Sequence, residues 1–256
     1  MGFIEQIKAD RKRYQTAVVL LIVIGLTGFF NNMWVIGVFL SVIYVFALHE
    51  AIGLFNLKKE TLLYPIAIAI WIGALFYPRP IEMLFLALIL CASVVAFNQK
   101  HDLRLALPFL YPTAPLLFLF VLYDEYGIFA YIWLLVIVIA CDVGAYYAGK
   151  SMGKTPFSPS SPNKTLEGVA GGITAGTLLG ALAGLPMGIG VYAVIVISLL
   201  ASMASIFGDL IESYLKRLAN VKDSGALLPG HGGMLDRIDG YLFAVVALLM
   251  SLRVVS

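Results

Sequence analysis

Nine apolar stretches divide this sequence, and they constrain its fold more than any other feature does. A transmembrane helix needs about 20 mainly apolar residues, because the hydrocarbon core of a bilayer is about 30 Å thick. The chain is 61% hydrophobic and 12% charged, whereas soluble domains contain about 25% charged residues. We therefore predict an all-α, polytopic integral membrane protein with about nine spans. The expected spans are Thr16–Phe30, Met33–Leu48, Leu62–Tyr77, Ile81–Phe97, Leu105–Tyr123, Gly127–Gly149, Gly168–Gly184, Gly188–Phe207 and Gly240–Val255.

The positions of the basic residues predict how the chain is oriented, because cytoplasmic loops of membrane proteins are enriched in Lys and Arg. With a cytoplasmic N-terminus and alternating spans, 15 of the 17 basic residues fall in cytoplasmic segments, and only Arg79 and Arg253 lie outside. We therefore expect a cytoplasmic N-terminus and two polar cytoplasmic segments, 150–167 and 208–239. The net charge is only +2, so the overall charge gives no reason to expect nucleic-acid binding.

The segment 208–239 contains most of the candidate site residues. Charge at the edge of a membrane is costly, so such a cluster is a functional-site hypothesis. If a helix continues out of the eighth span, its polar residues fall on one face at helical spacing. An amphipathic helix with an ion pair between Glu212 and Lys216 would give the same pattern. The residues of this face are Ser205, Asp209, Glu212, Ser213, Lys216 and Arg217.

Two carboxylates enter the ninth span together. Asp236 and Asp239 form D-x-x-D on one helical face and follow the run P-G-H-G-G. Carboxylates at this spacing repel each other unless a cation or a proton lies between them. Because Mg²⁺ is commonly held by one or two carboxylates and phosphate oxygens, the pair predicts a magnesium site together with Asp209. His231, between glycines, fits a positioning role better than direct chemistry, although the sequence leaves both open.

The segment 150–167 offers a phosphate site and a misleading motif. Lys164 and Thr165 precede a Gly-rich helix start, where free N–H groups can bind phosphate. An ordinary loop that starts a helix would look the same. The run Gly144–Ser151 fits the P-loop pattern G-x-x-x-x-G-K-[ST]. A P-loop must follow a strand and open a helix, whereas this run is expected to continue an apolar helix that ends near Lys150.

The run from Ser213 to Asp239 reads S-Y-L-K-R-L-A-N-V-K-D-S-G-A-L-L-P-G-H-G-G-M-L-D-R-I-D, and it resembles the signature of phosphatidate cytidylyltransferases, also called CDP-diacylglycerol synthases. Two earlier runs, Ser161–Gly172 and Asp142–Gly149, resemble the family as well. The resemblance as a whole covers roughly Leu105–Val255. The matching residues of the first run are Ser213, Lys216, Arg217, Lys222, Asp223, Gly225, His231, Gly232, Gly233, Asp236, Arg237 and Asp239.

The resemblance implies an enzyme that condenses CTP with phosphatidic acid to give CDP-diacylglycerol and pyrophosphate. It implies Mg²⁺ and a second cation such as K⁺, a homodimer formed through membrane helices, and a location in the bacterial cytoplasmic (inner) membrane with the active site on the cytoplasmic side. We accordingly expect residues 1–104 to be a variable region of transmembrane helices and residues 105–256 to be the catalytic transmembrane domain.

The resemblance also implies roles for individual residues. We expect Asp209, Asp236 and Asp239 to hold the metal, and Asp142 to orient a lysine or complete a second cation site. The phosphates of CTP are expected to contact Lys164, Lys222 and Arg237, and the lipid phosphate Lys216 and Arg217. Asp223 and His231 complete the expected catalytic set, and Thr165, Ser205, Ser213, Gly232 and Gly233 the substrate-binding set.

Two other functions remain open from the sequence. A CTP-dependent polyprenol or phytol kinase would also have many spans and basic loops, but it gives no reason for the whole run G-H-G-G-x-x-D-R-x-D. An ion-coupled transporter could use Asp142 as its ion site. Transporter sites lie near the middle of the membrane between internal repeats, whereas this sequence shows no repeat and its polar residues gather at one face.

Overall fold

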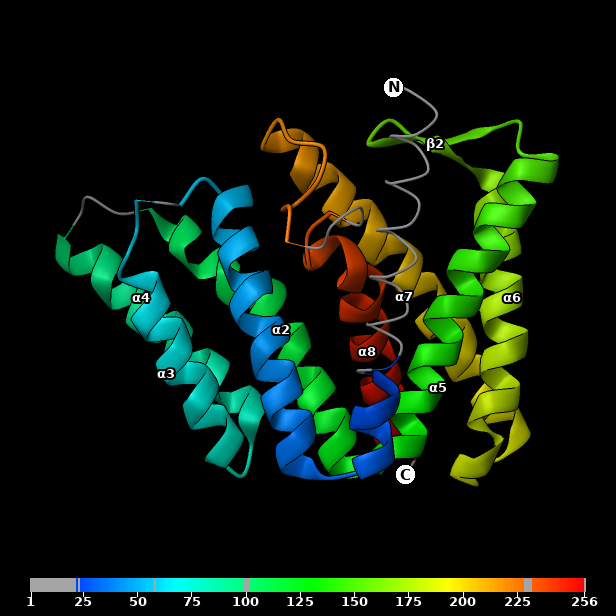
Figure 1. Cartoon of the computed structure of the whole chain (residues 1–256), viewed down its shortest axis with the longest axis horizontal. Helices are drawn as coiled ribbons and strands as arrows, with labels where there is room; N and C mark the ends of the chain where they lie inside the picture. Colours follow the sequence, from blue (N-terminus) through cyan, green and yellow to red (C-terminus); the bar gives the residue numbers. More distant parts are fainter. Residues whose placement is uncertain (1–21, 23, 58, 99–101, 228–231, 256) are drawn as a thin grey trace. The chain divides into compact units, whose positions relative to one another are not determined.

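The structure is a computed structural model that describes residues 22, 24–57, 59–98, 102–227 and 232–255. Within these residues the chain is almost entirely helical, and six helices are long and apolar enough to cross a membrane. This confirms the prediction of an all-α, polytopic membrane protein. The elements are α2 (Met33–Leu54), α3 (Leu63–Phe76), η1 (Pro80–Glu82), α4 (Met83–Asn98), η2 (Leu103–Ala106), η3 (Phe109–Thr113), α5 (Ala114–Met152), β1 (Pro156–Ser158), β2 (Ser161–Thr165), α6 (Leu166–Gly184), η4 (Leu185–Met187), α7 (Val191–Leu218) and α8 (Leu235–Val255) (Figure 1).

The chain divides into two compact units. The first comprises Met1–Ala114 and Ala219–Arg237, and the second comprises Pro115–Leu218 and Ile238–Ser256. The segment Ala219–Arg237 therefore belongs with the N-terminal helices although it is far from them in sequence. The boundary predicted between residues 104 and 105 separates a variable region from the catalytic region that the family resemblance implies. It stays a prediction.

Aromatic and polar side chains join α2 and α3 in the first unit. The ring of Tyr44 stacks on that of Trp71 with their centroids 4.3 Å apart. The Tyr44 hydroxyl donates to the carbonyl oxygen of Ala67 at 3.3 Å, and Trp71 Nε1 donates to Ser41 Oγ at 2.8 Å. Each polar group in this apolar interior thus has a partner, as buried polar groups require.

A row of glycines lets α6 approach α5 and α7 closely in the second unit. Gly168, Gly172, Gly176, Gly180 and Gly184 recur every fourth residue and are all buried. A Cβ atom on Gly172 would lie 2.8 Å from the carbonyl oxygen of Cys141, and one on Gly180 would lie 3.0 Å from Ser198 Oγ. Small residues of this kind are typical of close helix packing in membranes. The buried glycines of α6 therefore form its contact face with α5 and α7.

The long element α5 consists of two helices that reverse direction at Gly127. This glycine has φ +70° and ψ −163°, a conformation that an L side chain strongly disfavours. The Tyr131 hydroxyl donates to the carbonyl oxygen of Leu119 at 2.8 Å, although 12 residues of straight helix would separate the two by about 18 Å. The turn between the fifth and sixth expected spans is thus present, and the green ribbon of Figure 1 turns back there.

The expected fifth span lies within a candidate membrane span, Leu103–Met152, but its first part is not a regular α-helix. The prediction placed it at Leu105–Tyr123, whereas the structure has η2, η3 and a non-helical Tyr111 before α5 begins at Ala114. Pro108, Pro112 and Pro115 explain the difference, because proline lacks the N–H of a helical hydrogen bond and clashes with the preceding turn. The first expected span, Thr16–Phe30, is described only in its second half, where residues 24–30 are helical, and its first residues, 16–21, lie outside the described part of the chain.

Candidate active site

Three carboxylates and two lysines of the second unit lie within electrostatic range of one another, and we call them the acidic cluster: Asp142, Lys164, Asp209, Lys216 and Asp239. Lys164, at the end of β2, makes an ion pair with Asp209 of α7. Asp239, in the second turn of α8, is repelled by Asp209 and by Asp142 of α5 and is attracted by Lys216. The cluster thus brings together residues that are up to 97 positions apart, from Asp142 to Asp239.

Two glycines explain why α7 and α8 approach each other at this point. A Cβ atom on Gly208 would collide with the carbonyl oxygen of Asp239, and one on Gly240 would lie 2.7 Å from Ser205 Oγ. Ser205 is only 2% exposed. Because each aspartate is next to one of these glycines, the close helix contact also places Asp209 near Asp239. Ser205 therefore lies in the packing between the helices, beside the cluster.

The start of α6 is organised by its own side chains. Thr165 is the N-cap, and its hydroxyl accepts a hydrogen bond from the N–H of Gly168 at 3.2 Å. The carboxylate of Glu167 accepts from the backbone N–H groups of Lys154 and Thr155 at 3.1 and 3.2 Å. Before it, the expected loop contains the antiparallel hairpin β1–β2, which the sequence did not predict. Lys164 is therefore presented to the cluster from a folded hairpin.

The predicted polar face of α7 is helical to Leu218, as expected. Its residues nevertheless have different surroundings. Lys216 Nζ lies 3.3 Å from Oε1 of Glu212, whose side chain is fully buried, so the ion pair that was the alternative interpretation of this face is present. Ser213 Oγ donates weakly to Asp209 Oδ1 at 3.4 Å, and Arg217 is exposed.

In the first unit, Asp236 bonds to both ends of what we call the signature loop, which consists of the segments Ser224–Gly225 and Gly233–Asp236 and the residues between them. Its Oδ2 accepts hydrogen bonds from the N–H of Ser224 at 2.9 Å, the hydroxyl of Ser224 at 3.0 Å and the N–H of Gly233 at 2.7 Å. Gly232 has φ +80° and a Cβ atom there would lie 2.7 Å from the same oxygen. Lys222, Asp223 and Arg237 are exposed. His231 lies outside the described residues.

Sequence reasoning missed Glu50 of α2. Its carboxylate is bonded to Ser224, Met234 and Leu235, and the residue is 7% exposed. A lone carboxylate inside the apolar run 33–54 is itself a signal, since ionisable residues within apolar spans are rare and are commonly functional.

The acidic cluster suits Mg²⁺ in its chemistry. Asp209 and Asp239 are hard oxygen donors whose mutual repulsion a divalent cation would relieve. Among the described residues no group of three or more His, Cys, Asp and Glu side chains is placed to hold one ion. Since Mg²⁺ commonly takes only one or two protein carboxylates and completes its shell with phosphates and water, two carboxylates are sufficient for a nucleotide-bound ion. Asp236, the third expected ligand, belongs to the first unit and has the contacts described above.

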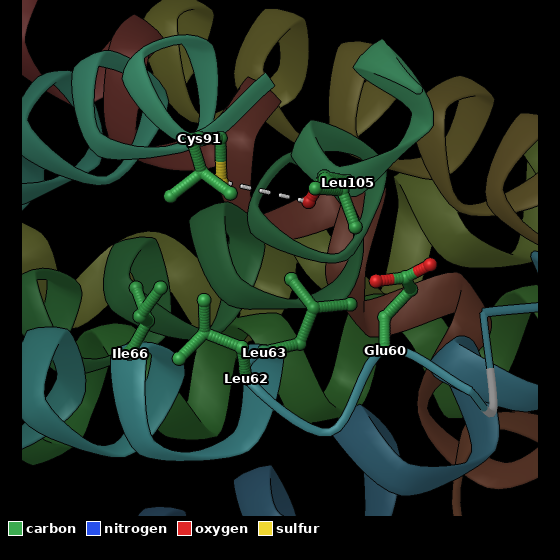
Figure 2. Close-up of a pocket in the computed structure, with 7 residues that line it drawn as sticks. Glu60, Leu62, Leu63, Ile66, Cys91 and Leu105 are labelled. Carbon is green, nitrogen blue, oxygen red and sulfur yellow. Dashed lines mark hydrogen bonds between the residues drawn. The ribbon is translucent and has the colours of Figure 1, made fainter. Parts of the chain in front are cut away.

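The first unit also contains a pocket that is lined mainly by apolar side chains. Figure 2 shows it, with the Cys91 thiol directed at the carbonyl oxygen of Leu105, 3.7 Å away. Its lining is Glu60, Leu62, Leu63, Ile66, Cys91, Val94 and Leu105, and it includes none of the expected site residues.

The structure does not support a P-loop at Gly144–Ser151. The run Gly144–Ser151 lies within α5, which continues as a helix to Met152. Lys150 is exposed, with its Nζ 5.6 Å from the centre of the Tyr146 ring. A strand, a loop and a new helix are required for a P-loop, and none of the three occurs at this run.

Comparison with known proteins gives consistent matches. The model of the cytidylyltransferase family matches residues 11–255. A Helicobacter pylori protein named phosphatidate cytidylyltransferase is 43% identical over 245 residues, which are 95% of this chain and 92% of that protein. Its Bacillus subtilis namesake is 44% identical over 138 residues, 52% of this chain and 51% of that protein.

Proposed function

The chain belongs to the cytidylyltransferase family, and on this premise we propose that it is a membrane enzyme that condenses CTP with phosphatidate. The phosphatidate oxygen forms a bond to the α-phosphorus of CTP. The bond from that phosphorus to the bridging oxygen of the β-phosphate breaks, and pyrophosphate leaves. The products are CDP-diacylglycerol and pyrophosphate. No side chain has to act as a nucleophile, because the phosphate of phosphatidate is already ionised.

The observation that carries the proposal is the acidic cluster itself. Both reactants are anions, so their repulsion must be neutralised before they can meet. Lys164 is held by Asp209, and its ammonium group has three N–H donors. One of these N–H groups donates to the carboxylate of Asp209, and the others can donate to phosphate oxygens. A Mg²⁺ ion held by Asp209 and Asp239 would supply charge neutralisation for the triphosphate.

Arg217 is the better candidate for the lipid phosphate than Lys216. Lys216 is engaged by the buried Glu212, whereas Arg217 is exposed at the end of α7. A guanidinium group can grip a phosphomonoester through two parallel hydrogen bonds. We infer that Arg217 contacts the headgroup and that Lys216 holds the end of α7 in place.

The remaining expectations form part of the same proposal. The chain has about nine spans, a cytoplasmic N-terminus and a cytoplasmic active site in the bacterial inner membrane. The distribution of basic residues supports this orientation. A homodimer and a second cation such as K⁺ follow only from the resemblance to the family.

The test is a product assay on purified protein in detergent. With CTP, Mg²⁺ and phosphatidate we expect CDP-diacylglycerol and an equal amount of pyrophosphate. With CTP, Mg²⁺ and a polyprenol we expect no phosphorylated lipid. Formation of polyprenyl phosphate without CDP-diacylglycerol would reject the proposal in favour of a lipid kinase.

A further inference from the structure

Glu50 forms hydrogen bonds with both ends of the signature loop, Ser224–Gly225 and Gly233–Asp236. Its Oε1 accepts from the N–H of Met234 at 2.8 Å, and its Oε2 accepts from the N–H of Leu235 at 2.9 Å and from Ser224 Oγ at 2.8 Å. All of these residues belong to the first unit. A buried carboxylate with this many donors has exchanged its water for fixed partners, which offsets the cost of burying its charge.

The two backbone contacts cap α8 from another helix. The first N–H groups of any helix lack a partner within the helix, and a Ser, Thr, Asp or Asn just before the helix usually supplies one. The helix α8 begins at Leu235, and the preceding residue is Met234, whose side chain has no oxygen. Glu50 supplies the missing acceptor, and its negative charge also suits the positive end of the helix dipole.

The glycines around Glu50 are explained by the same contact. A Cβ atom on Gly225 would collide with the Glu50 carboxylate, and one on Gly233 would collide with Ser224 Oγ and with Glu50. Gly233 belongs to the G-H-G-G run and Gly225 to K-D-S-G. The absence of a side chain at Gly225 and Gly233 therefore leaves room for the Glu50 carboxylate.

Ser224 connects Glu50 to Asp236. Its hydroxyl lies 2.8 Å from Glu50 Oε2 and 3.0 Å from Asp236 Oδ2. Since the hydroxyl carries a single hydrogen, it donates to one carboxylate at a time, while the N–H of Ser224 keeps its bond to Asp236. A displacement of Glu50 would therefore shift Ser224 and, through it, Asp236.

We propose that Glu50 is a positioning residue that fixes the two ends of the signature loop and the first turn of α8, and so holds Asp236 and Arg237 in the geometry the reaction needs. The reaction part of this statement rests on the proposed function. Glu50 itself acts through Ser224, Met234 and Leu235 and does not touch substrate.

The test compares Glu50→Gln with Glu82→Gln, a control in the first unit whose carboxylate is 45% exposed. Glutamine keeps the size of the side chain but has only one acceptor oxygen. Full-length protein in detergent is examined by backbone amide exchange, by its melting midpoint and by steady-state kinetics with CTP and phosphatidate.

For Glu50→Gln we expect faster exchange confined to Ser224, Met234, Leu235 and their neighbours, with the melting midpoint close to that of the wild type. We expect kcat to fall roughly 10- to 100-fold, since displacements of about 1 Å at a site have effects of this size, with both KM values changed less than about twofold. Glu82→Gln should match the wild type in every measurement.

Two results would overturn the proposal. Exchange that rises throughout the chain together with a lower melting midpoint would make Glu50 a general stabilising residue. Exchange and kcat equal to those of the wild type would show that the loop does not depend on it. Because exchange is measured without substrate, a wild-type protein that forms no CDP-diacylglycerol would reject the proposed function while the local exchange still decides whether Glu50 anchors the loop.

Discussion

At the scale of single residues, the two aspartates of D-x-x-D differ in what they contact. Asp236 accepts hydrogen bonds from the N–H groups of Ser224 and Gly233 and shares the Ser224 hydroxyl with Glu50. Asp239 accepts a hydrogen bond from the N–H of Gly240 at 2.8 Å and is repelled by Asp209. The helix spacing placed both on one face of α8 correctly, but spacing alone could not assign a partner to either.

This difference predicts different phenotypes. Asp239→Asn should lower kcat roughly 10²-fold and raise the Mg²⁺ concentration needed for half-maximal rate, because a metal ligand and its charge are lost. Its melting midpoint should not fall, since the substitution relieves repulsion. Asp236→Asn should increase amide exchange at Ser224 and Gly233. Steady-state rates across a Mg²⁺ titration provide the measurement, and an Asp239→Asn enzyme with normal rate at limiting Mg²⁺ would remove this residue from the metal site.

Lys164 and Lys150 provide a second comparison at this scale. Lys164→Ala removes the cation that neutralises Asp209 and that is proposed to contact CTP, so we expect a loss of kcat/KM for CTP of roughly 10²-fold. Lys150→Ala removes an exposed side chain that lies over a tyrosine ring and should change the rate less than about twofold. CTP-dependent turnover measures both. An inactive Lys150→Ala beside an active Lys164→Ala would restore the P-loop interpretation.

The contacts of Glu50 could not be predicted from the sequence. Its partners lie 174, 184 and 185 positions further along the chain, and no local periodicity links such positions. The signature loop was recognised from its own composition, but the side chain that holds it comes from a helix whose pattern indicates only a membrane span.

At the scale of elements, apolar runs predicted that the chain is helical, and the glycine spacing of α6 is explained by its packing. The glycines of α6 repeat at every fourth position, which places them on one helix face, and that face is the buried one. The prediction gave too little weight to the prolines, so it expected a regular α-helix before Ala114, where the structure has the irregular elements η2 and η3. The hairpin β1–β2 was missed because its strands are only 3 and 5 residues long.

The glycine contact leads to a prediction about stability. Gly172→Ala places a Cβ atom 2.8 Å from the carbonyl oxygen of Cys141 and 3.0 Å from Ala145 Cβ, so α5 and α6 must separate. Overpacking of this kind costs about 1–3 kcal/mol, and the melting midpoint in detergent should fall by roughly 2–4 °C for each kcal/mol. Gly25→Ala is the control, because no atom of the described residues beyond its own helix turn lies within 4 Å of the added carbon. Equal melting midpoints for the two variants would contradict the assigned packing.

At the scale of the whole molecule, the orientation depends on charge. The two basic residues that do not fit the cytoplasmic assignment are both neutralised: Arg79 pairs with Glu82 at 3.1 Å, and Arg253 Nε with Glu125 Oε2 at 2.9 Å. Pairing with a carboxylate lowers the cost of carrying a cation through the bilayer to the outer side. A helix has the same hydropathy in either direction, so the direction of the spans is argued from the basic residues.

Cysteine labelling tests this orientation. Single cysteines at Lys154 and Lys222 should react with a membrane-impermeant maleimide only in inverted vesicles, and cysteines at Arg79 and Glu125 only in right-side-out vesicles, as the positive-inside distribution requires. The native Cys91 and Cys141 are 3% and 1% exposed, so their background labelling should be low. Labelling at Lys222 from the outer side would contradict a cytoplasmic site.

The most direct test of cytidylyl transfer follows the phosphorus atoms of CTP. Attack of phosphatidate on the α-phosphorus must carry that atom into the lipid and leave the β- and γ-phosphorus in pyrophosphate. With CTP labelled at the α-position we expect all of the transferred label in CDP-diacylglycerol, and with CTP labelled at the γ-position we expect none in lipid. Label from the γ-position in the lipid fraction, with no transfer from the α-position, would contradict the account and identify a CTP-dependent lipid kinase.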